Sequence, residues 1–101
     1  MKPFEWNKTK SEWLKNERNI SFEEIAIALS EIKRVPAFKH PNQGKYPGQK
    51  VFLVNIKGYA YMVPFVEDTE KIFLKTIFRS RKATRKYLNA QQGEKNGSKN
   101  G

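Results

Sequence analysis

The chain contains no cysteine and only one histidine, and its ten Asp and Glu residues are outnumbered by twenty Lys and Arg residues. Without cysteine, a disulfide scaffold and thiol chemistry are excluded. No apolar run is long enough to cross a membrane, and the opening MKPFEW is not followed by the apolar segment of a signal peptide. We therefore expect a cytoplasmic protein with no membrane partner.

The few acidic residues are unevenly distributed. Residues 1–31 carry five basic and six acidic side chains, whereas residues 32–88 carry thirteen basic and three acidic ones. From Ile32 to Val66 there is no acidic residue at all, although a merely solubilising surface normally mixes both signs. This pattern favours a nucleic acid as partner; a solvated basic face is the alternative, and an acidic protein partner is compatible with either.

The length of 101 residues and the 38% hydrophobic content suffice for one modest core. We expect a single domain over residues 1–88 and a disordered polar tail over residues 89–101, because the tail contains almost no apolar side chain.

Two helices are predicted in the first third of the chain. Asn7 is a suitable N-cap for a helix of about eleven residues that buries Trp13 and Leu14 and ends at Asn19, since asparagine tolerates the left-handed conformation. A second helix begins at Ser21 with a Ser-x-x-Glu capping box, and its apolar residues recur at helical spacing: Phe22, Ile25, Ala26, Leu29 and Ile32.

Beyond Lys33 the apolar period changes to two, and four strands are expected in an antiparallel meander: VPAF, KVFLVNI, YAYMVPF and KIFLKTIF. Lys57-Gly58 joins the second and third strands tightly. Pro64 lacks an amide N–H, so the third strand should be bulged there or have that edge unpaired. Ser80 can cap a last helix from Arg81 to Leu88. The predicted fold is therefore α+β, in the order α-α-β-β-β-β-α.

The residue types restrict the chemistry. One histidine, no cysteine and few acids in the basic region offer no metal site, and no cofactor motif is present. Cleavage of RNA requires neither a metal nor a nucleophile from the enzyme, because the 2′-hydroxyl supplies the nucleophile. The enzyme need only move protons and stabilise charge on the phosphate. The candidate catalytic residues are His40, Lys75, Arg81 and Tyr87, and the candidate RNA-binding residues are Lys39, Tyr46, Arg79, Lys82, Arg85 and Lys86.

Each candidate also has an ordinary structural explanation. His40 lies between Lys39 and Lys45, which favour the neutral imidazole of a general base, but it could simply order its loop. Lys75 is expected to alternate with Phe73 and Ile77 on one strand face, as a phosphate contact or a residue at the rim.

The start of the last helix is the strongest candidate for phosphate binding. Arg81 and Lys82 would lie in its first turn, where the helix dipole disfavours cations, so an anion is expected to offset the repulsion. Two ordinary exposed cations are the alternative. Tyr87 and Tyr46 can donate a phenolic proton or stack on a base, while Tyr87 is equally compatible with a place in the core.

The order of elements resembles the BrnT family of bacterial toxins, within the larger RelE/ParE-like superfamily of toxin–antitoxin systems. FEWNKTKSEWLKNERNISFEE resembles the start of that family, and FLKTIFRSRKATRKYL resembles its closing strand and helix. HPNQGKYPGQ and YAYMVPFVED are similar to one subgroup. The resemblance covers roughly residues 4–88.

The resemblance implies a RelE-like endoribonuclease that cleaves messenger RNA, on or off the ribosome. It also implies a cognate antitoxin, usually of the ribbon-helix-helix type, that inhibits the toxin and joins it on operator DNA. The chain departs from the family at Glu17-Arg18-Asn19, where typical members have lysine-histidine-glycine, at Lys75 or Thr76, where an arginine is typical, and near Tyr87, where a glutamate is common. Alternatives are a superfamily toxin that inhibits gyrase and a plain RNA-binding module.

Overall fold

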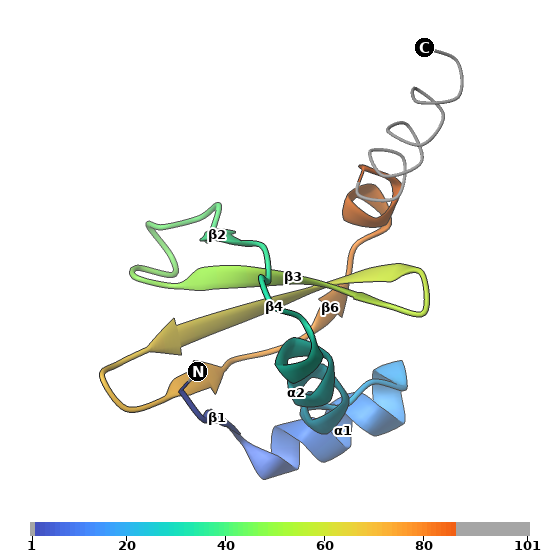
Figure 1. Cartoon of the computed structure of the whole chain (residues 1–101), viewed down its shortest axis with the longest axis horizontal. Coiled ribbons are helices and arrows are strands. Elements are labelled where there is room, and N and C mark those ends of the chain that lie inside the picture. Colours follow the sequence, from blue (N-terminus) through green and yellow to red (C-terminus); the bar gives the residue numbers. More distant parts are fainter. Residues whose placement is uncertain (1, 87–101) are drawn as a thin grey trace.

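Two helices and a six-stranded sheet make up most of residues 2–86, the part of the chain that the computed structural model describes (Figure 1). The predicted α+β class is confirmed, and residues 81–86 form a further helical segment. The labelled elements are β1 (Phe4–Trp6), α1 (Lys8–Arg18), α2 (Phe22–Glu31), β2 (Ala37–Lys39), β3 (Lys50–Ile56), β4 (Tyr59–Glu67), β5 (Ile72–Leu74) and β6 (Phe78–Arg79).

The sheet has the order β1-β5-β4-β3-β2, and β6 pairs with β4. β1 is parallel to β5, and the other pairs are antiparallel. The prediction of four strands was wrong in two respects: β1 was not expected, and the predicted fourth strand is divided into β5 and β6. A strand as short as β1 has no periodicity of its own, so only its pairing with β5, far along the chain, reveals it.

The caps of both helices are confirmed. The Asn7 side chain accepts a hydrogen bond from the Lys10 N–H (2.9 Å), and Asn19 ends α1 with φ 56°. The Ser21 hydroxyl accepts from the Glu24 N–H (3.2 Å), while the Glu24 carboxylate accepts from the Ser21 N–H (3.1 Å). These local hydrogen bonds satisfy backbone donors that the helices leave without a partner, which is why the sequence could locate them.

The core lies between the helices and one face of the sheet, where α1 and α2 pack side by side (Figure 1). Leu14 is fully buried, but Trp13 is 48% exposed, so the prediction that both are buried was wrong for Trp13. Ser11 explains the difference, because its hydroxyl donates to Glu23 (2.8 Å) and accepts from the Phe22 N–H (3.0 Å). This link turns Ser11 and Leu14 inward, and Trp13 is left on the outer side of α1.

The turn between β3 and β4 has the predicted two-residue form. Lys57 and Gly58 both have positive φ, 54° and 81°, and the Asn55 side chain accepts a hydrogen bond from the Gly58 N–H (3.0 Å). Two central residues with positive φ match the twist of a hairpin, which fixes the register of β3 against β4.

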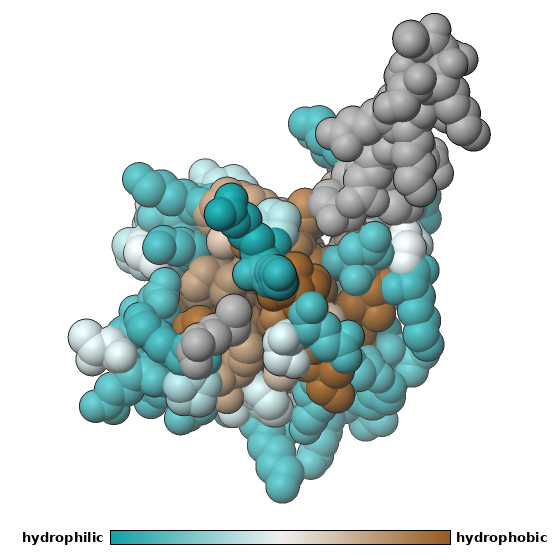
Figure 2. All heavy atoms as spheres, in the orientation of Figure 1, coloured by the Kyte–Doolittle hydropathy of each residue, from teal (hydrophilic) through white to brown (hydrophobic). Residues whose placement is uncertain are grey.

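Within residues 2–86, no helix is long and apolar enough to cross a membrane. The predicted disordered tail, residues 89–101, lies outside the described residues, as does Tyr87. Hydrophobic residues gather over the middle of the face drawn in Figure 2, and hydrophilic side chains surround them.

The capping box of α2 provides a stability test. Ser21→Ala should lower the free energy of unfolding by about 1 kcal/mol, because the Glu24 N–H loses the hydroxyl that accepts its hydrogen bond. Ser30→Ala is the matched control, since Ser30 is an exposed serine in the same helix. Urea unfolding measures both, and an equal loss in the two variants would contradict the role of the cap.

Candidate nucleic-acid interface

A β-bulge divides the last strand and sets the direction of its side chains. β5 pairs Leu74 with Phe65, whereas β6 pairs Phe78 with Met62, so the three residues 75–77 lie opposite only two in β4. The extra residue interrupts the alternation of faces along the strand.

The bulge lies beside Pro64. The Lys75 N–H donates to the Pro64 carbonyl (2.8 Å), and in an antiparallel sheet the amide nitrogen and carbonyl of one residue face the same neighbouring strand. The donor that Pro64 lacks is therefore missing on the side where β5 and β6 separate. The predicted disturbance at Pro64 is present, but the extra residue belongs to the neighbouring strand and Pro64 itself stays paired with Val51 of β3.

The bulge changes the expected position of Ile77, whereas Lys75 stays on the exposed face that it shares with Phe73. Ile77 is fully buried in the core, as is Leu74, whereas Lys75 is exposed. Lys75 and Ile77 thus do not share a face, because the additional residue between β5 and β6 reverses the alternation. Lys75 and Thr76 both line a cleft outside the core.

This cleft, which we call the histidine cleft, has a volume of about 500 Å³. It contains two predicted catalytic residues, His40 and Lys75, together with the predicted RNA-binding residue Tyr46. No carboxylate contributes to its lining, which consists of Lys10, Arg18, His40, Tyr46, Gln49, Pro64, Lys75, Thr76 and Phe78. The side chains present are therefore suited to an anionic ligand.

The loop between β2 and β3 holds His40 in one orientation. The His40 Nδ1 accepts a hydrogen bond from the Asn42 N–H (3.0 Å), and the His40 ring lies against Tyr46 with 4.4 Å between the ring centroids. An Nδ1 that accepts a hydrogen bond cannot carry a proton, so the neutral ring has its proton on Nε2. In this arrangement His40 offers a ligand an N–H donor, rather than the lone pair that a general base requires.

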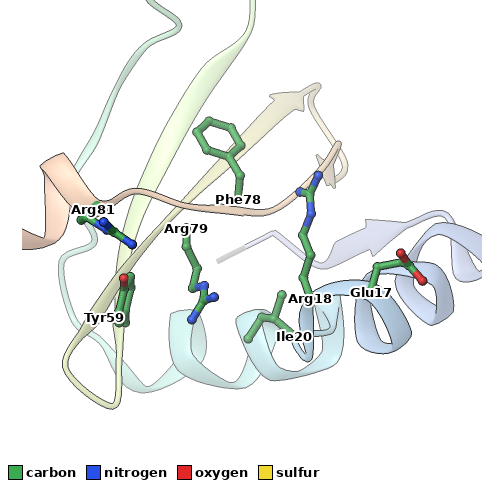
Figure 3. A pocket seen from close by; sticks show the side chains of 7 residues that line it. All are labelled: Glu17, Arg18, Ile20, Tyr59, Phe78, Arg79 and Arg81. Atoms are coloured by element: carbon green, nitrogen blue, oxygen red, sulfur yellow. The ribbon is translucent and has the colours of Figure 1, made fainter.

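A second cleft, the arginine cleft, has a volume of about 410 Å³ and is drawn in Figure 3. It brings together the predicted residues Arg79 and Arg81 with Arg18. Its remaining lining residues are Glu17, Ile20, Tyr59 and Phe78. In Figure 3 the Glu17 carboxylate is directed away from Arg79 and Arg81.

Backbone contacts position these arginines. Arg79 belongs to β6, and its guanidinium lies 4.9 Å from the centroid of the Tyr59 ring. The Ser80 hydroxyl accepts from the Ala83 N–H (3.0 Å), which confirms the predicted N-cap. The Ser80 N–H also donates to the Ala60 carbonyl (3.1 Å), so the start of the helical segment that carries Arg81 is attached to β4.

Arg18 connects the two clefts, because it lines both. Its Nη1 donates to the Ile77 carbonyl at 2.6 Å, inside the bulged segment. Arg18 and Lys10 were missed by the sequence analysis, which treated the first third of the chain as electrically neutral. A helical projection could have found them, since Lys10 and Arg18 are eight residues apart and share a face of α1.

The remaining predicted residues lie outside both clefts. Lys39, Lys82, Arg85 and Lys86 are exposed and line neither one, and Tyr87 is not among the described residues.

Within residues 2–86, the ion pairs join Lys2 and Lys50 to Glu67, Lys15 to Glu24, and Lys71 to Glu5. None of these pairs includes a cation of either cleft. In the described part of the chain, therefore, no ion pair neutralises the positive charge there, although Glu17 lines the arginine cleft.

The carboxyl groups with perturbed pKa values serve local structure instead. A hydrogen bond from Lys15 lowers the pKa of Glu24, and the backbone N–H of Glu70 lowers the pKa of Asp68 in the turn after β4. Neither group lines the two clefts. In the described part of the chain, no group of three or more His, Cys, Asp or Glu residues is placed to hold a metal ion.

No protein-family model, curated protein or solved structure matches this chain significantly.

The tautomer of His40 can be measured directly. At pH about 8, where an ordinary imidazole is neutral, ¹⁵N-¹H correlation spectra of the ring should show the proton on Nε2 and an unprotonated Nδ1. The Asn42 N–H should show the corresponding hydrogen bond. A neutral ring protonated on Nδ1 would contradict the geometry and restore the general-base interpretation.

Proposed function

We propose that this protein is a cytoplasmic toxin of the RelE-like type, an endoribonuclease that cleaves messenger RNA without a metal ion. The observation that carries the proposal is the meeting of the two clefts at Arg18, with cations of α1, β6 and the bulge around them. Among residues 2–86, no carboxylate forms an ion pair with any of these cations. The resemblance of the chain to the BrnT family supports the same activity. Arg18 stands where members of that family carry a histidine.

The reaction needs stabilisation of negative charge at phosphorus. Attack by the 2′-hydroxyl forms a 2′-O–P bond and breaks the bond from phosphorus to the 5′-oxygen, leaving a 2′,3′-cyclic phosphate and a 5′-hydroxyl. Arg18 and Lys75 would bind the non-bridging oxygens, on which charge develops. Arg18 suits this role because its planar group can donate two parallel hydrogen bonds to one phosphate.

The proton transfers follow from the orientation of His40, whose proposed role differs from the expected general base. With its proton on Nε2, His40 would donate a hydrogen bond to a phosphate oxygen instead of removing the 2′-hydroxyl proton. Tyr46 lies against His40 and can supply its phenolic proton to the departing 5′-oxygen. The 2′-hydroxyl proton would pass to water, and water would reprotonate Tyr46. Tyr87 stays an alternative proton donor.

Arg79 and Arg81 would extend the binding surface. Because the arginine cleft shares Arg18 and Phe78 with the histidine cleft, an RNA strand can occupy both at once. Arg79 and Arg81 would then bind a phosphate next to the one being cleaved. The exposed Lys39, Lys82, Arg85 and Lys86 would contribute longer-range attraction to RNA.

Cleavage of a single-stranded RNA in chelator, with and without ribosomes, tests the proposal. Lys75→Gln should reduce the cleavage rate about a hundredfold, since it removes one charge that stabilises the transition state. Lys33→Gln is the matched control, because Lys33 is an exposed lysine that lines neither cleft, and it should leave the rate unchanged.

The products give a second criterion. The 3′ ends should carry cyclic phosphate, and a 2′-deoxy nucleotide at the cleaved position should block the reaction. If the purified chain leaves RNA intact under all these conditions and its expression does not arrest growth, the enzymatic proposal is wrong.

The same clefts suggest how the activity would be controlled. A cognate antitoxin with an acidic segment could bind the cations that would otherwise hold phosphate, and a ribbon-helix-helix portion of it would place the complex on operator DNA. This partner chemistry follows from the charge of the clefts and from the resemblance.

A neighbouring open reading frame should therefore encode a protein that co-purifies with this chain and inhibits cleavage. Raising the salt concentration should weaken the inhibition, because ion pairs at an accessible cleft are screened. Neighbouring products that neither co-purify nor inhibit would reject the antitoxin part and leave the nuclease part standing.

A further inference from the structure

A third cleft adjoins the histidine cleft and has aromatic walls. It has a volume of about 570 Å³ and is lined by Asn7, Thr9, Lys10, Trp13, Phe73 and Lys75. Lys10 and Lys75 belong to both linings, so the two clefts are continuous at these lysines. We call it the tryptophan cleft.

Trp13 is unusual among the aromatic residues of the described chain. It is 48% exposed, whereas Trp6, the other tryptophan, stacks on the buried Phe22 at 6.1 Å. Cationic groups approach its ring: the Lys10 Nζ lies 5.9 Å and the Arg18 guanidinium 5.3 Å from the ring centroid. Trp13 thus keeps about half of its surface exposed to solvent while two positive charges lie over its ring.

The residues that β5 and the bulge contribute to the cleft are also aromatic or cationic. Phe73 is half-buried in β5, and the Lys75 Nζ lies 5.4 Å from the centroid of its ring. Four of the six lining residues are therefore aromatic or cationic, and none is acidic. A ligand that fits this lining is flat, has an apolar face, and is joined to a negatively charged group.

We propose that Trp13 is a stacking platform for one unpaired base of a single-stranded RNA, directly beside the phosphate held by Lys75 and Arg18. Aromatic side chains next to a cationic groove are the usual means of binding single strands, since every base has a π face. The bases inside a duplex are stacked on each other and cannot reach the ring. The inference rests on the proposed function, because it adds a base site to the same RNA surface.

The site makes the protein selective for unpaired RNA. A phosphate bound at Lys75 positions the strand, and the base on Trp13 adds binding that does not depend on charge. The cleft lining contains one amide side chain and one hydroxyl, from Asn7 and Thr9, so stacking rather than hydrogen bonding to base edges dominates its recognition.

The test uses a short 2′-O-methyl RNA, which lacks the nucleophile and cannot be cleaved by the proposed reaction. In the Trp6→Phe background, where Trp13 is the only tryptophan, binding of this oligonucleotide should quench the fluorescence. A strand of abasic nucleotides with the same phosphates, and a duplex of the same sequence, should quench far less.

Affinity measurements supply the second arm. Trp13→Ala should weaken binding of the single strand about tenfold and leave the salt dependence unchanged, because a base contact releases no counterions. Lys75→Gln should instead lower the slope of log K against log salt by about 0.7. Trp13→Phe should retain part of the affinity, and Phe38→Ala, which truncates an exposed aromatic outside the three clefts, should have no effect.

The outcomes separate this inference from the proposed nuclease. If RNA is cleaved but Trp13→Ala binds the base-containing strand as tightly as the parent, with a native circular dichroism spectrum, the stacking site is wrong and the nuclease stands. If no RNA is cleaved but the single strand quenches Trp13 and the abasic strand does not, the base site stands without the nuclease. Equal quenching by single strand, duplex and abasic strand would overturn the inference.

Discussion

The amide hydrogen that Pro64 lacks is the constraint on which the functional surface depends. On the side of β4 that faces the last strand, Pro64 offers a carbonyl but no N–H, and there the strand takes in an extra residue and divides into β5 and β6. The division lets Leu74 and Ile77 both enter the core while Lys75 and Thr76 face outward. In a regular strand Lys75 and Ile77 would both face outward and Thr76 would face the core. The bulge leaves Lys75 outward, turns Ile77 into the core and places Thr76 at the histidine cleft.

Helix α1, which lies near the start of the sequence, contributes the remaining side chains of that surface. Ser11 and Leu14 face the core, while Lys10, Trp13 and Arg18 of the same helix line the clefts beside the bulged segment. The hydrogen bond from Arg18 to the Ile77 carbonyl joins the two elements. One helix thus supplies cations to all three clefts and the exposed aromatic ring to one of them.

Local features of the fold could be predicted from the sequence because their causes lie within a few residues. Asn7, Ser21 and Ser80 cap helices through contacts three residues away, and the Lys57-Gly58 turn depends only on its own backbone angles. The parallel strand β1 and the exposure of Trp13 could not be predicted in this way. The first depends on pairing with β5, and the second on the contact between Ser11 and α2.

The sequence by itself determined the excess of positive charge, the stretch from Ile32 to Val66 without acids, and the candidates His40, Lys75, Arg79 and Arg81. Only the tertiary structure decided which of these residues meet and which partners join them. It separated His40 and Lys75 from Arg79 and Arg81 into adjoining clefts. It also brought Arg18 between them from residues 1–31, where the basic and acidic side chains nearly balance. The physical reason is that net charge depends on composition alone, whereas a binding site requires side chains to converge. Convergence depends on strand register and helix packing, which local sequence patterns do not determine.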